Sequence, residues 1–164
     1  MKKSIVFVSI MLMILFSGCM PKTTPLPENQ KQLQNVVMVN NESKQEIYRK
    51  VKMWIVENFV SAKSVIDYEN PQQGIIVAKG NIQYPCSSTD TCMMVSNWHV
   101  SFMMKIEVKN NKMRITINHI SIVTPMSERE VNSVENMKVI KPKLLQLVND
   151  LTNYVKNPTS SNNW

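Results

Sequence analysis

The residue types most able to carry chemistry lie close together near the middle of the chain. They are two thiols, a carboxylate and an imidazole, on Cys86, Asp90, Cys92 and His99. All are zinc ligands, but their spacing matches no standard zinc site. In an oxidising compartment, an even pair of cysteines separated by a short loop predicts a disulfide. We therefore expect a Cys86–Cys92 disulfide and no metal; the alternative is a metal or small-ligand site centred on this loop and His99.

Methionines around the same region suggest a second metal chemistry, because thioethers bind soft ions such as copper(I). The four residues concerned are Met93, Met94, Met103 and Met104. Met104 falls on the apolar stripe of the following segment, and methionine often fills gaps in protein cores. A structural role is therefore the better interpretation of these residues.

No set of residues in the sequence indicates a catalytic centre. Nucleophilic catalysis requires a Ser or Cys held against a base that is itself oriented, and the two histidines, His99 and His119, have no evident acidic partner. With three glycines in the whole chain, no phosphate-binding or dinucleotide-binding loop is present. We expect a protein that is not an enzyme, with no catalytic residues and no cofactor.

The N-terminal segment predicts export. Residues 1–18 combine Lys2 and Lys3 with an apolar run too short to span a membrane, and Ser17-Gly18 lead directly into Cys19. This arrangement resembles the lipobox of bacterial lipoproteins, in which the cysteine is lipidated and becomes the mature N-terminus. The resemblance implies a lipid on Cys19 and attachment to the cell envelope. Met20, rather than Asp, at the next position implies the outer membrane, with the protein facing the periplasm.

Cleavage before Cys19 would leave 146 of the 164 residues and lower the net charge from +7 to +5, because Lys2 and Lys3 are lost. That length suits one domain with a sizeable core. The remaining positive charge is moderate and scattered, and an exported protein rarely meets nucleic acid, so we expect no nucleic-acid partner.

The mature chain divides into three parts by composition. Residues 19–35, which contain several prolines and polar residues, predict a lipidated cysteine followed by a flexible tether. Residues 36–157 have the apolar periodicity of a folded domain, and residues 158–164 predict a disordered tail.

Two segments of the domain have the apolar spacing of helices that bury one side. Residues 44–59 follow a capping pattern that begins at Ser43, and residues 142–156 begin at Pro142, which suits the first turn of a helix. Residues 127–130 could cap a further short helix. Residues 36–39, 64–68 and 75–84 predict strands, with Gly80 marking a bulge or a close contact.

The clearest strand signal is strict alternation from Trp98 to Val108, followed by a two-residue turn at Asn110-Asn111. This turn predicts a hairpin in which Val108 pairs with Met113 in the core and Glu107 pairs with Arg114 on the opposite face. Beyond Asn118 the alternation slips. Either a bulge resets the strand near His119, or Ile120 and Ile122 point away from the core.

These elements predict an α+β domain in the order strand, helix, four strands, helix. Two helices that each bury one side can cover only one face of an antiparallel sheet of about five strands. The other face is the better candidate for function, and it would carry Lys79, Asn81, His99, Met103, Lys105 and Arg114. A mixed apolar and basic surface of this kind suits a protein edge, a glycan or a second copy of the chain.

Several segments of the domain together carry a family resemblance: residues 46–48 with Trp54, and residues 58–66, 74–80 and 100–109 with the hairpin strand that follows. They resemble the bacterial DUF4468 family, a domain of unknown function described as having a TBP-like fold. The resemblance implies the fold and an exported protein or lipoprotein, and it brings no catalytic residues. A fold name is not evidence of DNA binding, because function resides in sites. We expect a lipid-anchored binding or assembly module of the cell envelope.

Overall fold

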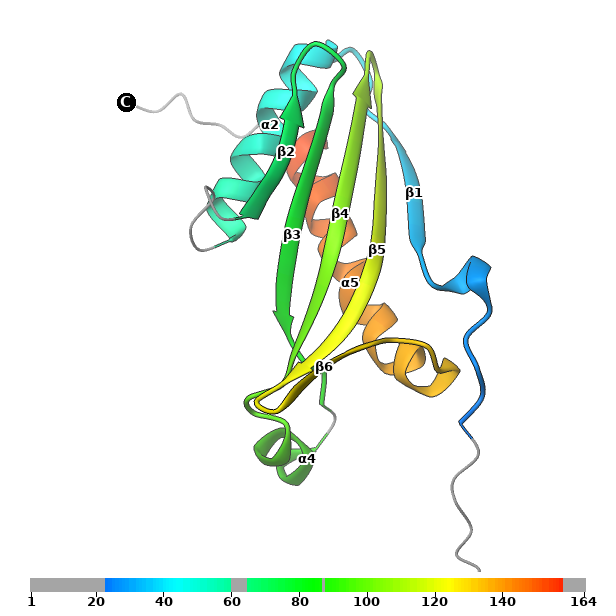
Figure 1. Cartoon of the computed structure of the whole chain (residues 1–164). Coiled ribbons are helices and arrows are strands. Elements are labelled where there is room, and N and C mark those ends of the chain that lie inside the picture. Colours follow the sequence, from blue (N-terminus) through cyan, green and yellow to red (C-terminus); the bar gives the residue numbers. More distant parts are fainter. Residues whose placement is uncertain (1–22, 60–64, 87, 158–164) are drawn as a thin grey trace, which may run out of the picture.

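Six strands form a single sheet in the computed structural model, which describes residues 23–59, 65–86 and 88–157 (Figure 1). In chain order the elements are η1 (Glu28–Gln30), β1 (Leu33–Met38), α2 (Lys44–Asn58), β2 (Ile66–Asn70), β3 (Ile75–Gln83), α4 (Thr89–Met94), β4 (His99–Lys109), β5 (Lys112–Thr124), β6 (Ser127–Glu130) and α5 (Val134–Lys156). The strands lie in the order β1-β5-β4-β3-β2, all antiparallel, and β6 pairs with the last part of β5. Cys19 and residues 158–164 lie outside the described residues.

The core lies between one face of this sheet and the two long helices, α2 and α5, which pass behind the sheet in Figure 1. The Ser43 hydroxyl accepts a hydrogen bond from the Glu46 N–H at 3.2 Å, so α2 begins where the capping pattern predicts. Ile47, Val51 and Trp54 follow at helical spacing and are buried. The predicted α+β architecture, with two helices on one face of an antiparallel sheet, is confirmed.

Within the described residues, no helix is both long and apolar enough to cross a membrane.

The β4–β5 hairpin has the predicted register. Val108 pairs with Met113 and Glu107 with Arg114, and Asn111 adopts a φ of 62° in the turn. Asparagine tolerates this left-handed conformation better than most residues, which explains the Asn-Asn turn. Gly80 on β3 is required by a close contact, because a Cβ atom there would meet the ring of Phe102 on the neighbouring strand.

A bulge at His119 accounts for the slip in alternation along β5. The β4–β5 register shifts there, and His119 has a φ of 49°. The extra residue turns Ile120 and Ile122 back toward the core, where both are buried. Of the two alternatives left by the sequence, the bulge is therefore correct.

Two expectations for the last part of the chain are wrong. Residues 127–130 form β6 rather than a helical cap, because their backbone groups pair with β5. α5 begins at Val134 instead of Pro142, since Ser133 caps it and Met137 and Ile140 continue its buried stripe. Pro142 lies on the exposed side of α5, where the carbonyl that loses its partner can reach water.

The packed chain also begins earlier than the predicted boundary at residue 36. β1 starts at Leu33, and Leu26 is buried with its N–H donating to the Asn132 carbonyl at 2.7 Å. The Thr24 carbonyl accepts the N–H of Val134 at 2.9 Å. Backbone pairing of this kind is independent of the polar side chains that suggested a free tether, so the described residues 24–35 belong to the domain.

Candidate functional site: the open face of the sheet

The face of the sheet opposite α2 and α5, which we call the open face, is not covered by any helix in Figure 1. Strand alternation and register place neighbouring side chains on it in rows across β3, β4 and β5. One row runs from Val77 through Lys105 to Thr116, and the next runs from Lys79 through Met103 to Asn118. The register thus brings together side chains that are far apart in the sequence.

The six predicted face residues lie on these three strands. Lys79 and Asn81 belong to β3, His99, Met103 and Lys105 to β4, and Arg114 to β5. Met103 and Lys105 are half-buried by their neighbours, whereas Lys79 and Arg114 are exposed. His99 pairs with Gln83 at the end of β3 that leads into α4, so it lies at the rim of the face.

The cations predicted on this face have acidic partners, which makes the face less basic than expected. Lys79 forms an ion pair with Asp67 of β2 at 2.9 Å. Glu107 lies between Lys105 and Arg114, at 3.3 and 3.2 Å. Because Glu107 is shared by two cations, these pairs reduce the positive charge of the open face without removing it.

Apolar groups on the outer strands enlarge the open face beyond the prediction. Tyr68 of β2 pairs with Val77, and Val36 of β1 pairs with Arg114; both side chains are exposed. The short apolar run at residues 36–39 hid the alternation, because the neighbours Val37 and Val39 are buried while Val36 and Met38 are not. Sequence reasoning could have found Val36 only with the pairing of β1 already known.

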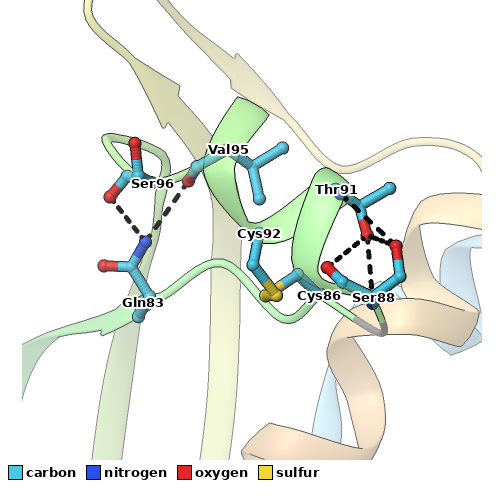
Figure 2. Close-up of a disulfide and its surroundings, with 7 residues drawn as sticks. All are labelled: Gln83, Cys86, Ser88, Thr91, Cys92, Val95 and Ser96. Carbon is cyan, nitrogen blue, oxygen red and sulfur yellow. Dashed lines mark hydrogen bonds between the residues drawn. A yellow bond between two sulfur atoms is a disulfide. The ribbon is translucent and has the colours of Figure 1, made fainter.

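The predicted Cys86–Cys92 disulfide is present and fastens the short helix α4 to the end of β3 (Figure 2). Ser88 caps this helix by accepting the N–H of Thr91, and the Gln83 amide donates to the carbonyls of Val95 and Ser96. Alternation assigns Gln83 to the open face, but these contacts show that it also holds the loop.

A largely apolar cavity of about 500 Å³ lies beside the disulfide. Its lining comes from the loop and from α5, with the residues Tyr84, Pro85, Cys86, Thr91, Val95 and Val139. His99 is not among them, because it lies on the opposite face of the sheet. The disulfide occupies both cysteine sulfurs, and the described residues contain no group of three His, Cys, Asp or Glu side chains that could hold a metal. The loop and His99 therefore do not form the single site of the alternative prediction.

The clearest electrostatic perturbation lies on the helix side, where α2 meets β2. The Tyr48 hydroxyl donates to Glu69 at 3.1 Å, and Lys52 pairs with the same carboxylate at 2.9 Å. Burial, followed by the hydrogen bond to Glu69, raises the pKa of Tyr48 to about 12. The contact with Lys52 lowers the pKa of Glu69. This cluster ties two elements together and does not reach the cavity.

The fold and the uncovered face define a class of protein: a mixed α+β domain built on an open antiparallel sheet, described as TBP-like. Residues 34–122 match the family described as "Domain of unknown function (DUF4468) with TBP-like fold", and the chain belongs to that family. Among solved structures, a TBP-like protein from Parabacteroides distasonis is similar, with 16% identity and a TM-score of 0.63 over 80% of this chain and 96% of that one. A DUF4468 family protein from Bacteroides ovatus gives 14% identity and a TM-score of 0.60 over 81% and 91% of the two chains. No curated protein sequence matches the chain.

Proposed function

We propose that this protein is a lipid-anchored, non-enzymatic binding or assembly module of the cell envelope, and that its open face contacts another envelope protein. The observation that carries the proposal is the uncovered sheet face, on which Val77 and Met103 remain half-exposed and Tyr68 exposed. Rigid strands present these groups in fixed rows, which suits recognition of a matching surface. A glycan and a second copy of the chain are the other partners that such a face could take.

The internal ion pairs favour a protein partner over a polyanion. Lys105 and Arg114 already share Glu107 as a partner, so an anionic glycan or nucleic acid would have to compete with that carboxylate. A protein surface can instead cover Tyr68, Val77 and Met103 while the ion pairs form part of its polar rim.

The anchor rests on the lipobox-like sequence before Cys19, and Met20 supports the outer membrane as its location. The mass of the mature N-terminus, measured on protein extracted from its native envelope, tests this part. A diacylglyceryl-modified Cys19 is expected, and a mature chain without lipid would contradict the anchor.

Site-specific photo-crosslinking in the native envelope tests the open face. A crosslinker in place of Met103 should capture one envelope protein, whereas a crosslinker at Val56, exposed on α2, is the matched control on the other side of the domain. Equal capture from both positions, or none from Met103, would contradict the assignment. Charge reversal of Lys79, Lys105 and Arg114 together should also weaken co-purification of the partner.

The apolar cavity beside the disulfide supports a second candidate function, the binding of a small apolar ligand. A volume of about 500 Å³ falls in the range of ligand pockets. Native mass spectrometry of the protein from its envelope should then detect a bound apolar molecule that is lost when Val139 is changed to Asp. An empty protein at every stage of purification would argue against this function.

A further inference from the structure

The two ends of the sheet, taken along the strands, differ in character. One end carries α4, the β5–β6 turn and the start of α5, and the first described residues reach the domain there (Figure 1). We call this the anchor end. The other end carries the turns after β1, between β2 and β3 and between β4 and β5.

The anchor end presents the most exposed methionines of the described chain. Met126, in the β5–β6 turn, is 97% exposed, and Met93 and Met94, on α4, are 70% and 79% exposed. The Cys86–Cys92 disulfide and the Ser88 cap hold α4 in place, so Met93 and Met94 are presented by a fixed element. Three large apolar side chains at one tip have no protein partner to explain them in the described residues.

Charge is distributed just as unevenly. Residues 84–100 contain a single carboxylate, Asp90, and no lysine or arginine, and residues 115–127 contain no acidic or basic residue except His119. The turns of the opposite end, by contrast, carry Glu42, Lys44, Lys109 and Lys112. Charges at this end come from Glu128, Arg129 and Glu130 of β6 and from Glu135 in the first turn of α5. The two segments that carry the exposed methionines are otherwise nearly free of charge, which favours contact with the boundary of a lipid bilayer.

The contacts of Thr24 bring this tip close to the anchor. Because the Thr24 carbonyl is bonded to Val134 at the start of α5, the only chain that can separate Cys19 from the domain is the stretch up to Thr24. Fully extended, that stretch spans about 17 Å. A lipid on Cys19 would therefore hold the anchor end of the domain close to the membrane.

We infer that the anchor end is a membrane-contacting surface in which Met93, Met94 and Met126 dip into the bilayer interface. This inference rests on the proposed lipid anchor. The contact is apolar rather than electrostatic, since the charged residue of α4 is Asp90, and a carboxylate does not attract anionic lipid. It adds a second attachment to that of the lipid, and two attachments limit how the domain can tilt. The strands then run away from the membrane, and the open face looks sideways along it.

Methionine oxidation by hydrogen peroxide tests the inference, because its rate follows exposure of the thioether. The mature lipidated protein, reconstituted in phosphatidylethanolamine and phosphatidylglycerol vesicles, is compared with the mature Cys19→Ser chain in solution. On vesicles, Met93, Met94 and Met126 should oxidise at least about fivefold more slowly. Met38 on β1 and Met53 on α2, which are also exposed, are internal controls and should change less than about twofold.

A double variant, Met93→Asp with Met126→Asp, should fold normally because both side chains are exposed, and it should abolish the protection of Met94. Met38→Asp is the matched variant and should leave that protection intact. An unchanged rate for Met126 on vesicles would overturn the contact, and so would equal slowing of all five methionines, which indicates association of protein copies. The N-terminal mass separates the two proposals: absence of lipid on Cys19 overturns the anchor and this inference with it, whereas a lipidated chain with unprotected methionines overturns the contact alone.

Discussion

Replacement of Lys50 by alanine should destabilise the domain far more than the same change at Lys52, which lies two residues further along α2 and is much more exposed. Lys50 is only 7% exposed. Its ammonium group donates to the Glu42 carboxylate at 2.6 Å and to the Val155 carbonyl at 3.3 Å, near the C-terminus of α5. The residue thus joins α2, α5 and the loop after β1.

The magnitude follows from these contacts. A hydrogen bond to a charged group contributes about 1.5–3 kcal/mol, and the buried methylene stem adds packing that alanine cannot replace. Lys50→Ala should therefore lower the free energy of unfolding by about 2–4 kcal/mol, since it also leaves Glu42 without its partner. For a domain of this size, each kcal/mol lowers Tm by roughly 3–5 °C.

Lys52→Ala is the control, because Lys52 also belongs to α2 and also pairs with a glutamate, Glu69, at 2.9 Å. The Lys52 side chain is 44% exposed, and exposed pairs of this kind contribute less than about 1 kcal/mol. Urea unfolding followed by tryptophan fluorescence measures both variants, and Trp54 is buried in the core beside them. Equal losses for Lys50→Ala and Lys52→Ala would refute the reasoning. A double variant, Lys50→Met with Glu42→Gln, should recover much of the stability, because no charge is then left without a partner.

Three further changes follow from other parts of the fold. Gly80→Ala should lower the free energy of unfolding by about 1–3 kcal/mol, measured in urea, because the new Cβ meets the Phe102 ring. An unchanged unfolding midpoint would mean that the ring moves aside freely. His119→Gly should leave the free energy of unfolding unchanged or raise it by up to about 1 kcal/mol, because glycine adopts the φ of 49° without strain. His119→Val should lower it, since this φ disfavours a branched side chain. The opposite order of stability would contradict the bulge. The pKa of Tyr48 is raised from 10.0 to about 12, so its contribution to stability is complete below pH 10 and is lost as the pH rises from 10 to 12. In Tyr48→Phe, the midpoint of urea unfolding should therefore depend less on pH over this window. A variant whose midpoint keeps the same pH dependence would exclude Tyr48 as its source.

Local patterns predicted the elements whose partners are close in the sequence. The β4–β5 hairpin has the expected register because the Asn110-Asn111 turn and the alternation on both sides agree. The Ser43 cap and the apolar stripe that follows predicted α2 to within one residue of its end. The disulfide followed from the spacing and even number of the two cysteines that remain after Cys19.

The candidate site was predictable only in outline. Alternation placed Lys79, Met103 and Lys105 on the uncovered side, because each strand carries that information in its own sequence. Alternation also puts Lys105 and Glu107 on the same face of β4, so their ion pair was predictable from the sequence. It did not reveal the pair between Lys79 and Asp67, because that pair depends on how β2 and β3 align. Tyr68 and Val36 joined the face for the same reason.

By itself, the sequence determined the hairpin, the helix α2, the disulfide and the existence of one uncovered sheet face, because each depends on periodicity or spacing within a short stretch of chain. The tertiary structure decided where the domain begins and how its ends differ. Leu26 is buried and Thr24 is bonded only because residues 131–134 return to the same place, and β6 is a strand only because the last part of β5 offers it a partner. Such pairings depend on backbone groups brought together from distant positions, and no local pattern of side chains records them.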